Sequence, residues 1–298
     1  MAISHKKAIR GPYFVIAGMP RGATTFLYHN LQKHPTVYLP FRKETNYFVV
    51  NYSRGINWYL GLYRDMRADQ IGGDISPLCF MSPGSAERIN EFRNDMKVIL
   101  SIRDPVEWVL SFYSQFRSFT FGMASFEDFI DGYTMSIGKY KIHLEFRNNK
   151  VLRTIEEFQK IFKDNLLIFK YDLLKKNPLS VLKLIENFLN LDSHFDKDNF
   201  DNFVINASGR GNNKLIEYLL SRESIITFMQ RMLPHRLVRV ARGYYNLQTT
   251  DRRKEGYPEK YVKLAVDAFG DQRNAILNFF GMHDVLLGTN EPLRNTFG

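Results

Sequence analysis

The chain has very little cysteine and no long apolar run. Cys79 is the only cysteine among the 298 residues, which excludes an intrachain disulfide and favours a reducing compartment. No segment approaches the ~18 consecutive apolar residues of a transmembrane helix, and the apolar run after Lys6 and Lys7 is too short for a signal peptide. We therefore expect a cytoplasmic protein without a transmembrane segment.

The sequence also lacks linkers, internal repeats and nucleic-acid-binding signatures. No Pro-, Gly- or Ser-rich stretch divides it, so we expect one domain over residues 1–298. Lys and Arg number 41 against 31 Asp and Glu, a balance that suits a polyanionic ligand or nucleic acid. Because helix-turn-helix, zinc-finger and RNA-binding aromatic patterns are all missing, we do not expect nucleic acid as a partner.

Short apolar runs alternate along the chain with amphipathic stretches. Within residues 151–162, Leu152, Ile155, Phe158 and Phe162 recur at helical spacing. This alternation predicts an α/β fold with a central parallel sheet flanked by helices. Hydrophobic residues make up 44% of the chain, which is enough for one large core.

Residues 18–26 have the character of a phosphate-binding loop. The apolar run at residues 13–17 predicts a strand before the loop, and a helix-like stretch follows it. Backbone N–H groups in such a turn and at a helix N-terminus stabilise a bound phosphate. Ala23 and Thr24 stand where a Walker A motif needs Gly and Lys, which disfavours nucleoside triphosphate hydrolysis. A nucleotide kinase, which usually needs Mg²⁺ and that missing lysine, is an alternative of a different class.

A second candidate phosphate site follows the apolar run at residues 97–102. Arg103 ends this predicted strand, Asp104 is suited to cap a helix, and Pro105 fits the first helical position. Ser111 lies about 9 Å further along the helix at ~1.5 Å per residue, so Arg103 and Ser111 can reach one phosphate. The alternatives are a surface Arg and a helix hydroxyl bonded to its own turn.

The two segments resemble the phosphate-binding motifs of sulfotransferases that use 3′-phosphoadenosine 5′-phosphosulfate (PAPS). Residues 20–26 are similar to the family's 5′-phosphosulfate loop, and the Arg-Asp-Pro string with a Ser eight residues after the Arg is similar to its 3′-phosphate site. Residues 43–48 and 73–77 resemble segments of the glycan-directed members, and residues 138–146, 166–178 and 206–210 are similar to other segments of the family. In these motifs the chain most resembles the glycan-directed (heparan-sulfate-type) and bacterial sulfotransferases.

The resemblance implies a P-loop-like sulfotransferase fold and a metal-independent transfer from PAPS to an acceptor hydroxyl. The residues that it assigns to PAPS binding are Arg21, Gly22, Ala23, Thr24, Thr25, Phe26, Arg103, Ser111, Tyr171, Ser208, Gly209 and Arg210. Arg21 matches a position often held by Lys, and we expect it to act as a catalytic electrostatic clamp because Arg stays protonated.

Three further positions depart from the family pattern. Ala23 replaces a usual Gly, and its Cβ favours a normal helical conformation over a strongly positive φ. Phe26 stands where Trp is common, and we expect its ring to stack on adenine. Ile75 stands where glycan enzymes often have a Lys near the sulfate, which weakens a direct transfer of their mechanism to this chain.

The acceptor hydroxyl is a poor nucleophile until a base removes its proton. The resemblance identifies Glu44 as this base, because the Glu of the matching Lys-Glu segment has that role in the glycan-directed branch. The alternative is that Glu44 only forms a surface ion pair with Lys43 or Arg42. The competing bases are His29, His34 and His143.

The acceptor is expected to be a glycan or another small molecule. The Lys43-Glu44 pair favours carbohydrate, whereas 25 Phe and 16 Tyr are equally compatible with a pocket for a lipid, steroid or secondary-metabolite alcohol. Residues 119–140 are expected to form either a mobile lid or a short helix near this acceptor. Residues 231–242 fit either peripheral contact with a membrane or ordinary core packing.

Overall fold

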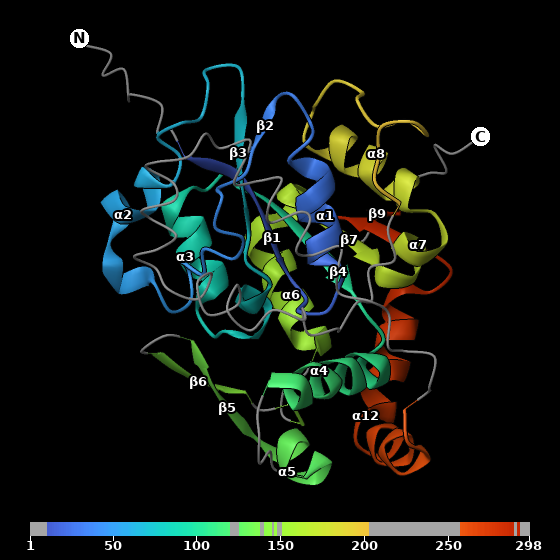
Figure 1. Cartoon of the computed structure of the whole chain (residues 1–298). Coiled ribbons are helices and arrows are strands. Elements are labelled where there is room, and N and C mark those ends of the chain that lie inside the picture. Colours follow the sequence, from blue (N-terminus) through green and yellow to red (C-terminus); the bar gives the residue numbers. More distant parts are fainter. Residues whose placement is uncertain are drawn as a thin grey trace.

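A computed structural model describes residues 11–119, 125–137, 140–144, 146–147, 151–202, 257–288 and 291–292. Its centre is a seven-stranded sheet with the order β2-β3-β1-β4-β7-β8-β9 (Figure 1). The strands are β1 (Pro12–Gly18), β2 (Val37–Tyr38), β3 (Ile71–Ile75), β4 (Lys97–Ile102), β7 (Leu166–Lys170), β8 (Val285–Leu287) and β9 (Glu291–Pro292). The first five pair in parallel, and β8 and β9 pair antiparallel. The predicted α/β fold is confirmed.

Helices cover both faces of the sheet. One apolar cluster joins the sheet to α1 (Thr24–Leu31), α7 (Tyr171–Lys176) and α8 (Pro178–Phe188). The other joins it to α3 (Ser85–Phe92), α4 (Pro105–Phe119), α6 (Val151–Phe162) and α12 (Glu259–Phe280). The other helices within the described residues are α2 (Ile56–Gly61), α5 (Phe126–Asp131) and the short 3₁₀ turns Tyr52–Arg54, Pro77–Met81 and Lys163–Asn165. Among the described helices, none is long and apolar enough to cross a membrane.

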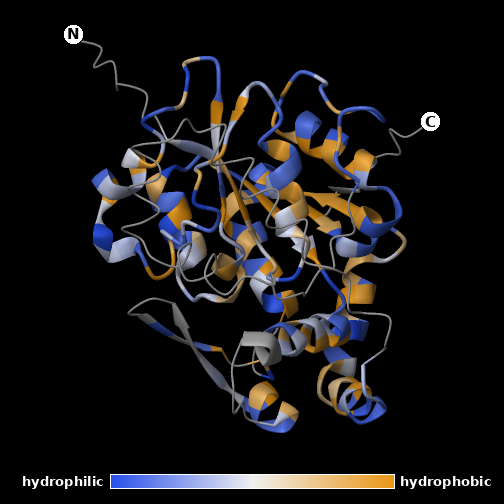
Figure 2. Cartoon of the chain, in the orientation of Figure 1, coloured by the Kyte–Doolittle hydropathy of each residue, from blue (hydrophilic) through white to orange (hydrophobic). Residues whose placement is uncertain are grey.

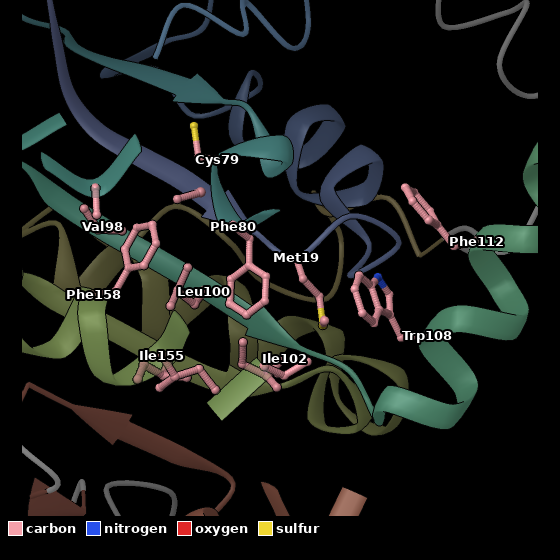
Figure 3. Close-up of a cluster of buried hydrophobic side chains, with 14 of the residues drawn as sticks. Met19, Cys79, Phe80, Val98, Leu100, Ile102, Trp108, Phe112, Ile155 and Phe158 are labelled. Carbon is pink, nitrogen blue, oxygen red and sulfur yellow. The ribbon is translucent and has the colours of Figure 1, made fainter. Parts of the chain in front are cut away.

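The core explains why the central strands are mainly apolar. In β4, Leu100 and Ile102 face the cluster on the α6 side, whereas Ile99 faces the α1 side. A strand that is buried on both faces needs a continuous apolar run in place of an alternating pattern. Figure 2 shows this apolar character concentrated on the central strands, and Figure 3 shows Leu100 and Ile102 among the buried side chains of one cluster.

The topology determines where a ligand site forms. β1 lies between β3 and β4, and the helices that follow β1 and β3 pack on opposite faces of the sheet. The carboxyl ends of β1 and β4 therefore meet at a topological switch point, where open parallel sheets bind ligands. The backbone confirms this junction, because the N–H of Met19 after β1 donates to the carbonyl of Ser101 in β4 at 2.9 Å.

Helix α4 starts at this junction as the sequence predicts. The Asp104 carboxylate accepts from the N–H groups of Val106 and Glu107 at 2.9 and 3.0 Å, and Pro105 is the first helical residue. Arg273 of α12 donates to both oxygens of the same carboxylate at 2.5 and 3.1 Å. This bidentate pair attaches the long α12 to the start of α4, the helix that carries Ser111.

The stretch at residues 119–140 contains regular structure where it is described. Ser125 and Asp128 form a capping box at the start of α5, and β5 (Tyr133–Ile137) pairs with β6 (Tyr140–Leu144) in a hairpin beside the helix (Figure 1). Residues 120–124 and 138–139 lie outside the described residues. The short helix expected as an alternative to a lid is therefore present.

Candidate active site

The loop after β1 fits tightly against the end of β4. A Cβ atom on Gly22 would lie 2.8 Å from the carbonyl oxygens of both Met19 and Ser101. Real Cβ atoms do not approach backbone this closely, so only Gly is compatible with the observed loop. This close approach holds the loop against the end of β4.

Two residues of the loop have left-handed backbone conformations. Arg21 has a φ of 66° and Ala23 a φ of 62°, so the expected normal helical conformation of Ala23 is wrong. This conformation costs a residue with a Cβ about 1–2 kcal/mol, and such strain is characteristic of functional sites. Ala23 is the N-cap of α1 and provides no side-chain acceptor, and the first turn has no acidic residue. The partial positive charge at this helix start favours an anion.

Four residues predicted to bind PAPS converge beside this loop. The Arg21 Nε donates to the Ser111 hydroxyl at 3.1 Å, which links the loop after β1 to α4. Arg103 is 7% exposed, and its guanidinium lies 4.8 Å from the ring centre of Tyr171. Its Nη1 approaches the Arg21 carbonyl oxygen at 3.5 Å. Two guanidinium groups, a hydroxyl and a phenol ring therefore meet at the ends of neighbouring strands.

Two buried polar atoms at this junction have no partner within the described residues. They are the Nε of Arg103 and the Oγ of Ser101. A buried donor without a partner costs about 1–3 kcal/mol, so such atoms need an explanation in a folded protein. Both are groups that bind phosphate oxygens, and they fit a nucleotide phosphate at the end of β4. Ser101 was not predicted from the sequence, because it reads as an ordinary strand residue.

The other predicted loop residues occupy different environments. Thr24 is 6% exposed in the first turn of α1, and Thr25 is exposed beside it. Phe26 is fully buried in the apolar cluster between α1 and the sheet, so its position does not support the expected stacking on adenine. Ser208, Gly209 and Arg210 lie outside the described residues, as do residues 231–242.

Glu44 forms an ion pair with its neighbour. Its Oε1 lies 2.7 Å from the Nζ of Lys43, and its side chain is 36% exposed. This pair is the surface contact that the sequence left open as an alternative, and it leaves the rest of the carboxylate accessible. Glu44 and Asn46 have left-handed φ values of 63° and 49°, so the backbone here is strained on both sides of Thr45.

A buried carboxylate beneath this strained segment fixes Thr45. Asp74, at the end of β3, is fully buried and accepts from the hydroxyls of Thr45 at 2.6 Å and Tyr59 at 2.8 Å. Its other oxygen accepts from Ser76 at 2.8 Å. Burial raises the pKa of Asp74, and these hydroxyl donors oppose the shift. The donors therefore make a buried acidic group tolerable at this position.

The same hydroxyls also hold the backbone that follows Glu44. Ser76 Oγ accepts from the N–H of Asn46 at 3.0 Å, and Thr45 Oγ1 accepts from the N–H of Tyr47 at 3.2 Å. Each hydroxyl thus donates to Asp74 and accepts from the loop, which fixes the direction of both hydrogen bonds. The segment that carries Glu44 is held by β3 through Asp74.

The three alternative bases lie elsewhere. His34 is 2% exposed beyond the end of α1, where Nε2 donates to the carbonyl of Asp192 at 3.1 Å, and burial lowers its pKa. His34 contacts the start of β2, which is parallel to β1, so it lies at the end of the strands opposite the loop. His29 contacts Gln32 in the last turn of α1, and His143 contacts Thr134 within the hairpin.

Replacing Thr45 by Val is expected to destabilise the protein by about 1–3 kcal/mol, because Asp74 loses a donor and the Tyr47 N–H loses its acceptor. Thr45→Ser keeps the hydroxyl and loses only a methyl group, about 0.8 kcal/mol. Urea denaturation of both variants measures the difference. A Val variant as stable as the Ser variant would contradict the role of this hydroxyl.

Comparison with known proteins agrees with this geometry. The family model described as a sulfotransferase domain matches residues 12–209, which include both strand ends and the Lys43-Glu44 segment. A solved structure, the sulfotransferase from Alicyclobacillus acidocaldarius, is similar with a TM-score of 0.51 and 18% identity. The similarity covers 65% of this chain and 86% of that chain, and it shows a shared fold.

Two curated relatives have higher sequence identity over shorter segments. The membrane-associated sulfotransferase kil1 of Dictyostelium discoideum is 36% identical over 105 residues, 34% of this chain and 22% of that protein. Heparan sulfate glucosamine 3-O-sulfotransferase 6 of Mus musculus is 34% identical over 117 residues, 39% of this chain and 34% of that protein. The matched segments thus span only 22% and 34% of these relatives' lengths. The family model matches more than half of the residues of this chain, so the chain belongs to the sulfotransferase domain family.

Proposed function

We propose that the protein transfers a sulfuryl group from PAPS to an acceptor hydroxyl. The observation that carries this proposal is the convergence of Arg21, Arg103 and Ser111 where β1 and β4 end, within the segment that matches the family. Two separate groups of hydrogen-bond donors that can bind phosphate lie at one switch point. This arrangement suits a nucleotide with phosphate groups on both its 3′ and 5′ sides.

In this proposal the binding site for PAPS, the sulfuryl donor, is formed by the two motifs. Arg103 and Ser111 bind the 3′-phosphate, which supplies acceptor atoms for the buried Nε of Arg103. The loop N–H groups, Thr24 and Thr25 bind the 5′ side, with Arg21 as the clamp. When bound, PAPS supplies an activated sulfuryl group attached to a good leaving group, a phosphate. Arg21 stays protonated, so it stabilises negative charge on that phosphate and donates no proton.

Glu44 acts as the base for the acceptor. The Lys43 ammonium lies 2.7 Å from one carboxylate oxygen of Glu44. The Glu44 side chain is partly exposed, so an acceptor hydroxyl can reach it from the solvent side. The Asp74 network supports this role, because it fixes the strained backbone on which Glu44 stands. In this account the acceptor hydroxyl gives its proton to Glu44 as its oxygen bonds to sulfur.

The acceptor is a glycan in this proposal. The curated relatives include proteins named as heparan sulfate glucosamine 3-O-sulfotransferases, and one of them is 34% identical over its matched segment. The Lys43-Glu44 pair is the feature of this chain that resembles the glycan-directed branch. Lipid, steroid and secondary-metabolite alcohols are the alternatives that an acceptor screen must include.

Gly22→Ala is expected to weaken binding of 3′-phosphoadenosine 5′-phosphate (PAP), the desulfated nucleotide, by at least about tenfold. The added methyl group displaces the loop from Ser101, against which Gly22 is packed. Titration calorimetry measures the affinity. Gly270→Ala in α12 is the matched control, because a Cβ there meets no atom within 4 Å. Unchanged PAP affinity in Gly22→Ala would contradict the loop's role.

Glu44→Gln is expected to lower kcat by about 10²- to 10⁴-fold, the usual contribution of a general base, with PAP affinity unchanged. Release of PAP during transfer to a heparan-type oligosaccharide measures the rate. Glu91→Gln on the exposed side of α3 is the control. If Glu44→Gln retains full turnover while the wild type transfers sulfate, the base is a different group.

A further inference from the structure

One carboxylate beside the candidate donor site contacts two cations at the same oxygen. The Oε2 of Glu107, in the first turn of α4, lies 3.1 Å from Nη2 of Arg103 and 3.5 Å from Nζ of Lys175. Lys175 belongs to α7, which follows β7, the neighbour of β4 in the sheet. Arg103 and Lys175 therefore lie on either side of one oxygen atom, although they come from different helix-strand units.

The ring of Tyr171 brings the same two cations together. The Arg103 guanidinium lies 4.8 Å from the ring centre and the Lys175 ammonium 5.0 Å from it. Both distances are within the range of a cation–π contact. Tyr171 and Lys175 are four residues apart in α7, so they share a helix face that is directed toward Arg103.

The charges and unpartnered atoms at this place favour an anion. The Glu107 carboxylate accepts a hydrogen bond from Nη2 of Arg103. The buried Nε of the same guanidinium has no partner among the described residues. Lys175 is 37% exposed and also pairs with Asp172 at 2.6 Å. Burial lowers the pKa of Lys175, but the carboxylates of Asp172 and Glu107 outweigh this effect and raise it, so the side chain is a cation at neutral pH.

We propose that Lys175 binds the 3′-phosphate of the donor nucleotide together with Arg103, and that Glu107 competes with that phosphate for both cations. This inference rests on the proposed function. A carboxylate and a phosphate take the same donors, but the phosphate offers a third oxygen and more charge. Lys175 has a long flexible side chain, so its ammonium can move from the Glu107 oxygen to a neighbouring phosphate oxygen.

The simpler alternative is that Lys175 only stabilises α7 through its contact with Asp172 three residues earlier. Lys176 is a matched control for this alternative, because it is the exposed neighbour of Lys175 on the same short helix. A Met side chain keeps the apolar stem against Tyr171 and removes the charge. Both substitutions remove one ammonium group from the same short helix, and Lys175→Met also removes the contacts with Asp172 and Glu107.

The test is titration calorimetry with two probes, PAP and 5′-AMP, which lacks the 3′-phosphate. Lys175→Met is expected to weaken PAP binding about five- to tenfold and to change 5′-AMP binding less than about twofold, since one phosphate contact is lost. Lys176→Met is expected to leave both affinities at the wild-type values. Equal PAP affinities in the two Met variants would overturn the assignment of Lys175.

Glu107→Gln tests the competition. It is expected to strengthen PAP binding about two- to fivefold, because a like charge is removed from the phosphate's surroundings. In the Lys175→Met background this gain is expected to shrink, because one of the two cations for which Glu107 competes is gone. Weaker PAP binding in Glu107→Gln would overturn the competition and show that the carboxylate supports Arg103.

The outcomes separate this inference from the proposed function. A wild-type protein that does not bind PAP contradicts the sulfotransferase proposal itself. A wild-type protein that binds PAP, with Lys175→Met indistinguishable from Lys176→Met, contradicts only the inference about Lys175. Thermal unfolding of each variant without nucleotide verifies that the compared proteins are equally folded.

Discussion

The close contact between the loop after β1 and the end of β4 is the constraint on which the candidate site depends. Gly22 lies against the carbonyl of Ser101, and the Met19 N–H donates to that carbonyl. This contact brings Arg21 to the Ser111 hydroxyl on the helix that follows β4. The contact thereby joins the two candidate phosphate-binding segments, while Glu107 and Tyr171 hold the Arg103 guanidinium.

Buried polar groups give the two sides of the site different characters. On the donor side, Arg103 is nearly buried, with part of its hydrogen-bonding capacity unpartnered among the described residues, which suits the binding of an anion. On the acceptor side, Asp74 is buried with three hydroxyl donors, which suits the holding of a loop. The first arrangement is suited to bind a ligand, and the second holds the strained backbone that carries Glu44.

Local sequence patterns predicted the features that depend on neighbours in the chain. The apolar runs indicated β1 and β4, and Asp104 and Pro105 indicated the start of α4. The contacts from Thr45 to Asp74 and from Lys175 to Glu107 were not predicted, because they join segments 29 and 68 residues apart. The burial of Phe26 and the left-handed Ala23 also follow from tertiary packing, which outweighs local preference. The cytoplasmic location and the catalytic role of Glu44 remain predictions.

The most direct test of this account is a titration of the wild-type protein with PAP and, separately, with ATP and Mg²⁺, repeated in Arg103→Ala and Ser111→Ala. The account predicts tight PAP binding and weak ATP binding, with the PAP affinity lost in both variants, because Arg103 and Ser111 bind the 3′-phosphate that ATP lacks. A wild-type protein that prefers ATP with Mg²⁺, or that does not bind PAP, would contradict it and favour a nucleotide kinase.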